Sequence, residues 1–157
     1  NADENELCRL DEIYSAAKTP FEIRSGSEKV TRRFFKICNN GRESFTGLYK
    51  SLTEHGICKG HQCIAYGLYM RDNGIGLSEG LAVYGYSICS AIVTNGVKLV
   101  PLSQLAGQKI LGESFELISS ASEKAIFTDI NDIGISGAGF DLRAMQHERL
   151  YSRQYMS

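Results

Sequence analysis

The feature that most constrains this fold is the spacing of the apolar residues, which recur along the chain at intervals of three and four. This spacing places them on one face of a helix, whereas a half-buried strand requires strict alternation. Short breakers separate the periodic segments, and no sustained period-two run bounded by hairpin turns is present. The sequence therefore predicts an all-α protein, a compact bundle of about six to seven helices.

The breakers place the expected helices along the chain. Pro20 ends the first, Ser27 and Ser78 are expected to cap two others, and Pro101 is expected in the first turn of a later one. That later helix is expected to bend or break at 119–120, before a turn-rich segment at 128–139. The expected helices span residues 7–17, 27–38, 44–52, 60–70, 78–95, 101–118 and 140–150.

Length and composition predict one ordered domain over residues 1–157. A single hydrophobic core typically serves a chain of about 100–200 residues. The content of 43% hydrophobic and 22% charged residues is that of a globular protein rather than of a disordered chain. Because the sequence begins with Asn1 rather than Met, we expect a segment upstream of it.

The net charge and the number of cysteines limit the classes of binding partner and the cellular compartment that we expect. The formal net charge of −1 offers no basic surplus for nucleic acid or an anionic membrane. The most apolar stretch, residues 77–100, contains Glu79, Lys98 and several glycines, which favours a buried core helix over a membrane span. Five cysteines are an odd set in a chain that does not need disulfides, and they predict reduced thiols in the cytoplasm.

Four possible soft-metal ligands lie within nine residues, namely His55, Cys58, His61 and Cys63. Their spacing lacks the two separated ligand pairs of a structural zinc site, and it runs from a loop into a helix where side chains diverge. A free cysteine is commonly a small buried hydrophobic residue. Ordinary packing is the favoured interpretation, and a metal site made of these four residues is the weaker alternative.

No catalytic motif is complete. His147-Glu148 begins like a metalloprotease motif, but Tyr151 occupies the position of the second histidine. The glycines near residue 137 lack the lysine and spacing of a phosphate-binding loop, so we expect no GTP binding by this chain. A small helical hydrolase would require a polar constellation that the sequence does not offer. We expect no enzyme, no catalytic residue and no bound cofactor.

Two long segments have no catalytic explanation. One is Val97-Lys98-Leu99-Val100-Pro101-Leu102-Ser103-Gln104 with Gly107-Gln108, and the other is Ala144-Met145-Gln146-His147-Glu148-Arg149-Leu150-Tyr151-Ser152-Arg153. The first resembles the V-K-x-V-P-L-[GS]-Q-x-x-G-Q pattern of the UreF family of urease accessory proteins. The second resembles the family's M-Q-H-E-x-x-Y-S-R pattern. The order of the two segments and weaker similarity elsewhere extend the resemblance over most of the chain, except for the family's N-terminal region.

The resemblance implies an all-α homodimer that binds the accessory protein UreD (UreH in some organisms) and the GTPase UreG, and acts with them on apo-urease. In this interpretation the partner proteins handle nickel and GTP, and the chain itself is an adaptor. The alternative is a metallochaperone that binds nickel directly through the four histidines and cysteines.

Candidate partner-binding residues fall in the two motif segments. Tyrosine, arginine and methionine are enriched at interface hot spots, so we expect the tail at 151–157 to be flexible alone and ordered by UreD/UreH. A frayed end is the simpler alternative for the tail. Lys98 either meets an acidic partner or is merely solvated, and Gln104 and Gln108 share one helical face. The full set is Tyr151, Ser152, Arg153, Tyr155, Met156, His147, Lys98, Gln104 and Gln108.

Overall fold

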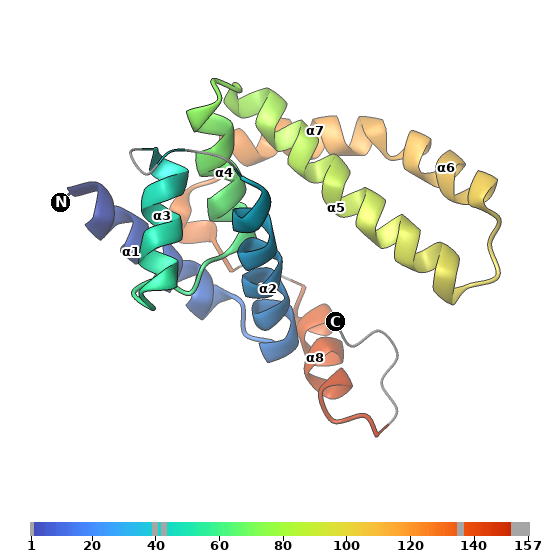
Figure 1. Cartoon of the computed structure of the whole chain (residues 1–157). Helices are drawn as coiled ribbons and strands as arrows, with labels where there is room; N and C mark the ends of the chain where they lie inside the picture. The colour runs from blue at the N-terminus through green and yellow to red at the C-terminus, as the bar shows by residue number, and fades with distance from the viewer. Residues whose placement is uncertain (1, 39–40, 42–43, 135–136, 152–157) are drawn as a thin grey trace. The chain divides into compact units, whose positions relative to one another are not determined.

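The structure is a computed structural model that describes residues 2–38, 41, 44–134 and 137–151 (Figure 1). These residues form eight α-helices and one short 3-10 helix, with no strand among them. The all-α prediction is confirmed, with slightly more helices than expected. The chain divides into two compact units, residues 1–73 with 129–157 and residues 74–128. The expectation of one domain over residues 1–157 stays a prediction.

Unit 1, as we name the first of these, is built around a small apolar core. Its buried members come from helices near the start of the chain and from the loop that joins two of them: Leu7, Phe35, Tyr49, Leu52, Cys58 and Ala65. The elements of unit 1 are α1 (Ala2–Ala17), α2 (Phe21–Ile37), α3 (Phe45–Glu54), α4 (Gln62–Asp72), η1 (Ile130–Asp132) and α8 (Ala138–His147).

Two helix starts in unit 1 show what the local sequence can and cannot specify. The start expected at Ser44 is confirmed, because the Ser44 side chain accepts a hydrogen bond from the Gly47 N–H. The start expected at Ser27 is wrong, since α2 begins at Phe21 directly after Pro20. Ser27 lies buried within the helix, where its hydroxyl accepts a hydrogen bond from the Gln62 N–H. Its capping chemistry therefore serves the start of α4 instead.

Unit 2 contains three helices, α5 (Leu77–Leu99), α6 (Gln104–Glu113) and α7 (Phe115–Ile126), and α5 packs against both of the others. Gly76 rather than Ser78 precedes α5. Pro101 lies before α6, because Ser103 caps that helix by accepting a hydrogen bond from the Ala106 N–H. The break expected at residues 119–120 falls instead at Ser114, between α6 and α7.

The helix expected in the most apolar stretch is present as α5, but the expected burial is wrong. Only 6% of its most apolar window is buried, and Ile92 and Leu99 are each more than half exposed. Among the described residues, α5 is the one helix long and apolar enough by length and composition to cross a membrane. A single helix of this kind is weak evidence for a membrane span. Exposed apolar side chains are also found where a protein surface binds a partner.

Candidate functional site

A buried polar cluster ties the loop between α3 and α4 to α1. Asp11 of α1 is only 2% exposed. One of its carboxyl oxygens, Oδ1, accepts hydrogen bonds from the Tyr49 hydroxyl at 2.5 Å and the Gly60 N–H at 3.0 Å. The other, Oδ2, accepts from the Lys59 N–H at 2.8 Å. Buried polar groups persist only when they are paired in this way, so Asp11 fixes the course of the loop.

Tyr49 extends this cluster to the start of α4. Its hydroxyl oxygen accepts a hydrogen bond from the His61 N–H at 2.8 Å while donating to Asp11. Burial, followed by the hydrogen bond to Asp11, raises the pKa of Tyr49 well above its ordinary value. Tyr49 therefore stays a neutral phenol, which suits a structural donor and acceptor rather than an acid–base catalyst.

His61 is fully buried beside the same cluster. Its Nε2 lies 2.7 Å from the Ser15 hydroxyl, and its ring lies 4.8 Å from that of Tyr14. Its Nδ1 is buried without a hydrogen-bond partner. Burial has the largest influence on the pKa of His61 and lowers it. The imidazole is therefore neutral near pH 7.

The other three possible soft-metal ligands, Cys58, Cys63 and His55, differ in their burial and in their neighbouring groups. Cys58 is buried with its sulfur 3.7 Å from that of Cys8, and burial raises its pKa to about 12. Burial likewise raises the pKa of the Cys63 thiol. His55 is exposed, with its Nδ1 2.8 Å from the Ser51 carbonyl oxygen. The part of the chain that the structure describes contains no group of three or more histidine, cysteine or acidic side chains placed to hold a metal.

The protonation of these thiols bears on the nickel alternative. A thiolate, not a thiol, binds a metal, and both Cys58 and Cys63 are held toward the protonated form by burial. His61 already shares a hydrogen bond with Ser15. Nickel binding through Cys58 or Cys63 would therefore have to displace a thiol proton whose loss burial disfavours.

The second motif segment joins α8 to the first turn of α2 through a clasp formed by Glu148, His147 and Glu22. Glu148 Oε1 accepts a hydrogen bond from the Phe21 N–H at 2.8 Å and lies 3.4 Å from the Glu22 nitrogen. His147 Nδ1 lies 2.6 Å from Glu22 Oε2. The carboxylate of Glu148 thus supplies the cap that Pro20 cannot provide, at the end of the helix where negative charge is favourable.

The first motif segment spans the junction of α5 and α6. A Cβ atom at Gly107 would lie only 2.6 Å from Val97 Cγ2, so this position requires glycine for the two helices to approach. Lys98, in the last turn of α5, is exposed, as are Gln104 and Gln108 on α6. Part of the motif therefore serves packing, and the three polar candidates remain at the surface.

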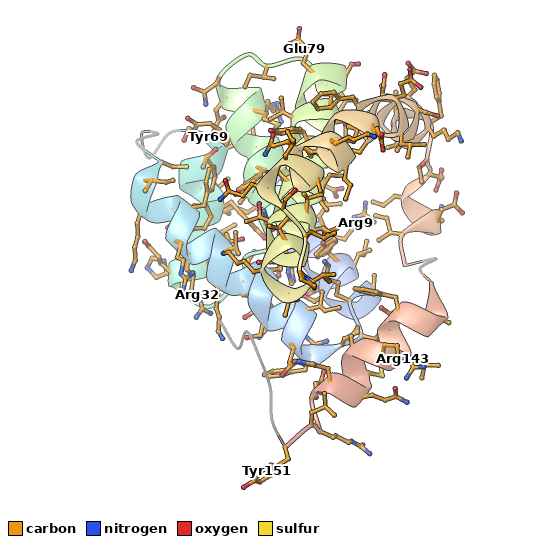
Figure 2. The ribbon with its side chains drawn as sticks, turned by 90° about the vertical axis from the view of Figure 1, so that its right-hand side faces the viewer. Arg9, Arg32, Tyr69, Glu79, Arg143 and Tyr151 are labelled. Carbon is orange, nitrogen blue, oxygen red and sulfur yellow. The ribbon has the colours of Figure 1, made fainter. Side chains whose placement is uncertain are left out.

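The tail contributes one described candidate. Tyr151 is fully exposed and points away from the ribbon just after α8 (Figure 2). Ser152, Arg153, Tyr155 and Met156 lie outside the described residues. Of the predicted partner-binding set, the structure shows Tyr151, Lys98, Gln104 and Gln108 as exposed side chains and His147 as a half-buried one.

Comparison with known proteins identifies the family. The UreF family model matches residues 1–114. The urease accessory protein UreF of Actinobacillus pleuropneumoniae is 34% identical over 158 residues, a match that covers all of this chain and 70% of the relative. The chain belongs to the UreF family.

Other UreF relatives agree with this assignment. The urease accessory protein UreF of Haemophilus influenzae is 35% identical over 153 residues, which cover 96% of this chain and 65% of the relative. That of Streptococcus thermophilus is 28% identical over 148 residues, which cover 94% of this chain and 62% of the relative. The family is named for an accessory role and not for an enzyme activity.

The clasp and the Asp11 cluster are the parts of this UreF-family chain that sequence reasoning missed. Asp11 lies four residues after Leu7, on the apolar face of α1, and an acidic residue at that position was an available signal. Nothing near Pro20 indicates that a glutamate 127 positions after Phe21 will cap α2. Glu148 lies in the second motif segment, but it was not among the predicted site residues.

Proposed function

We propose that this chain acts as a non-catalytic adaptor in urease maturation, bridging UreD (UreH) and the GTPase UreG to apo-urease for nickel insertion. The observation that carries the proposal is membership of the UreF family, whose relatives bear the name urease accessory protein. Exposed motif residues support it: Lys98 at the α5–α6 junction and Tyr151 after α8 are free of the core and available to a partner. We place this work in the cytoplasm.

A pull-down with UreD/UreH and UreG tests the adaptor. The bait is this chain joined to the N-terminal region of the family, and we expect a complex with both partners. Replacing Tyr151 with alanine should weaken capture of UreD/UreH, while replacing the exposed Phe127 of unit 2 serves as a matched aromatic control. Failure to capture either partner with the unaltered bait would refute the adaptor assignment.

Equilibrium dialysis with nickel separates the adaptor from a nickel metallochaperone. We expect no tight binding by the folded chain, because burial raises the pKa of Cys58 and Cys63 and so disfavours their thiolates, and because His61 is hydrogen-bonded to Ser15. Stoichiometric tight binding that is lost in both Cys58→Ser and His61→Ala would establish the metallochaperone instead.

We also propose that the chain works as a homodimer through the exposed face of α5. The helix has no charged side chain between Glu79 and Lys98, so pairing two copies about a twofold axis would bring no like charges together along that stretch. Ile88 and Ile92 are four residues apart and exposed by 42% and 65%. Sedimentation velocity should show a dimer that Ile92→Lys converts to a monomer, whereas an unchanged sedimentation coefficient would refute this face.

A further inference from the structure

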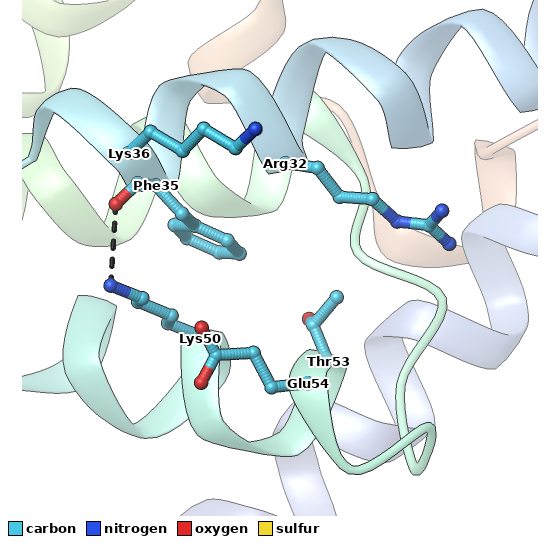
Figure 3. Close-up of a pocket in the computed structure, with 6 residues that line it drawn as sticks. All are labelled: Arg32, Phe35, Lys36, Lys50, Thr53 and Glu54. Carbon is cyan, nitrogen blue, oxygen red and sulfur yellow. Dashed lines mark hydrogen bonds between the residues drawn. The ribbon is translucent and has the colours of Figure 1, made fainter.

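A pocket of about 410 Å³ lies between α2 and α3 in unit 1 (Figure 3). Three of the side chains that line it are basic, Arg32, Lys36 and Lys50, and one is acidic, Glu54. Phe35 and Thr53 complete the lining. A local excess of positive charge is distinctive in a chain whose formal net charge is −1, and it attracts a negatively charged ligand.

The floor and one wall of this basic pocket are held in place by the fold. Phe35 is only 5% exposed, and its ring meets that of Tyr49 edge-on at 6.1 Å between centroids. The Lys50 ammonium donates a hydrogen bond to the Phe35 carbonyl oxygen at 3.3 Å, as the dashed line in Figure 3 marks. An ammonium has three N–H donors, so the bond fixes the position of Lys50 and leaves donors for a ligand.

The other two cations are available for binding. Arg32 is 65% exposed and lies 3.8 Å from Glu28 of the same helix, a long contact that leaves most of the guanidinium open to a ligand. Lys36 is exposed one turn further along α2 and is labelled in Figure 3. A ligand that enters the pocket can therefore gain charge-assisted hydrogen bonds without breaking a strong internal pair.

The acceptors in the pocket select between classes of anion. The Glu54 carboxylate can only accept hydrogen bonds, and the Thr53 hydroxyl already donates its proton to the Tyr49 carbonyl oxygen. A peptide offers side-chain carboxylates to the cations and backbone N–H groups to these acceptors. An inorganic phosphate carries more negative charge and has few donors, so Glu54 disfavours it.

We propose that this basic pocket binds an acidic peptide segment of a protein partner, with Arg32, Lys36 and Lys50 contacting its carboxylates and Glu54 accepting from its backbone. The volume fits this occupant, because about 410 Å³ is within the usual range of about 300–1,000 Å³ for ligand sites. The proposal goes beyond the adaptor function and requires none of its named partners.

Fluorescence anisotropy with a capped, fluorescein-labelled peptide of alternating aspartate and glycine tests the pocket directly. We expect binding by this chain that weakens about tenfold or more in the Arg32→Glu, Lys36→Glu double variant, because two attractive charge contacts become repulsive. The matched control is Lys109→Glu, Lys124→Glu on α6 and α7, which changes the net charge equally at exposed positions. That control should bind like the unaltered chain.

Three outcomes would overturn the proposal. The first is equal loss in both double variants, which would show a nonspecific charge effect. The second is equal binding of a peptide with asparagine in place of aspartate. The third is displacement of the labelled peptide by inorganic phosphate as effectively as by unlabelled peptide. Circular dichroism of each variant confirms the helical fold, and Lys50→Met is a second pocket variant that also removes a cation.

Discussion

Units 1 and 2 are both helical, yet they are stabilised differently. In unit 1, side chains form hydrogen bonds between elements far apart in sequence, such as Asp11 with Gly60 and Asp72 with the Thr46 N–H. In unit 2, the hydrogen bonds of Ser87, Ser103 and Ser114 stay within three positions, and close approach at glycine brings the helices together. Polar bonds specify one arrangement in unit 1, whereas unit 2 relies on apolar packing and leaves apolar faces exposed.

This difference bears on the adaptor function that we propose. A network of satisfied buried polar groups rigidifies a structure and specifies its packing. Exposed apolar side chains such as Ile92 and Leu105 are instead available to bury area against a partner. Unit 1 therefore supplies fixed positions for charged groups, and unit 2 supplies apolar contact area.

The largest expected effect comes from Asp11→Ala, which tests whether unit 1 depends on its polar network. The substitution leaves the Tyr49 hydroxyl and the Lys59 and Gly60 N–H groups without their acceptor. We expect the free energy of unfolding to fall by about 3–5 kcal/mol, measured by urea denaturation. The exposed Asp3→Ala should change it by less than about 0.5 kcal/mol. A loss below about 1 kcal/mol in Asp11→Ala would show that the polar network does not stabilise unit 1 as we describe.

Gly107→Ala tests whether unit 2 depends on close helix packing. The new methyl group would meet Val97, a stiff β-branched side chain, at 2.6 Å. A Cβ atom at Gly112 of the same helix would have no neighbouring atom within 4 Å, so Gly112→Ala is the matched control and should gain about 1 kcal/mol of helix propensity. We expect Gly107→Ala to be less stable than this control by about 1–3 kcal/mol in thermal denaturation. Equal stability of the two variants would show that the α5–α6 contact is loose.

Acidification should weaken unit 1 through His61. Burial lowers the pKa of His61 in the folded state, so below the unfolded value of about 6.5 the unfolded state binds the additional proton. The free energy of unfolding therefore falls as the pH drops through that value, with a slope of at most about 1.4 kcal/mol per pH unit from this group. Urea denaturation from about pH 7.5 to about pH 5.5 measures it. A His61→Asn variant that keeps the same slope would assign the effect to other groups.

The clasp should give a smaller effect, because it joins partly exposed groups. Glu148→Ala removes the cap on α2 and should lower the free energy of unfolding by about 1 kcal/mol, whereas Glu148→Gln retains an acceptor and should lose less. Hydrogen exchange at the Phe21 amide should accelerate in the alanine variant. Unchanged exchange at Phe21 would mean that the amide is protected without Glu148.

The sequence specified the helices of this fold better than their surroundings. Periodic apolar residues and breakers such as Pro20 act locally, so they predicted where helices lie. Ser27 was expected to cap its own helix, but it accepts a hydrogen bond from the first residue of α4 instead. The packing of α2 against α4 determines this role, and the local sequence does not. The burial expected for α5 was wrong because composition measures how apolar a helix is and not whether its chain supplies a partner surface.

The candidate binding residues stay predictions. The first motif indicated Lys98, Gln104 and Gln108, and all three are exposed. The basic pocket could not be found in this way, because Arg32 and Lys50 come from separate helices and their proximity depends on how α2 packs against α3. Which cations lie together depends on contacts between helices, and a local sequence pattern does not specify those contacts.

The clasp between Glu148 and the start of α2 also orders events during synthesis. The amides of Phe21 and Glu22 are made 127 and 126 residues before the carboxylate that accepts from them. All of unit 2 is synthesised in that interval, because its residues lie between the two parts of unit 1. In the growing chain the first turn of α2 therefore lacks the Glu148 acceptor until all residues of unit 2 have been synthesised.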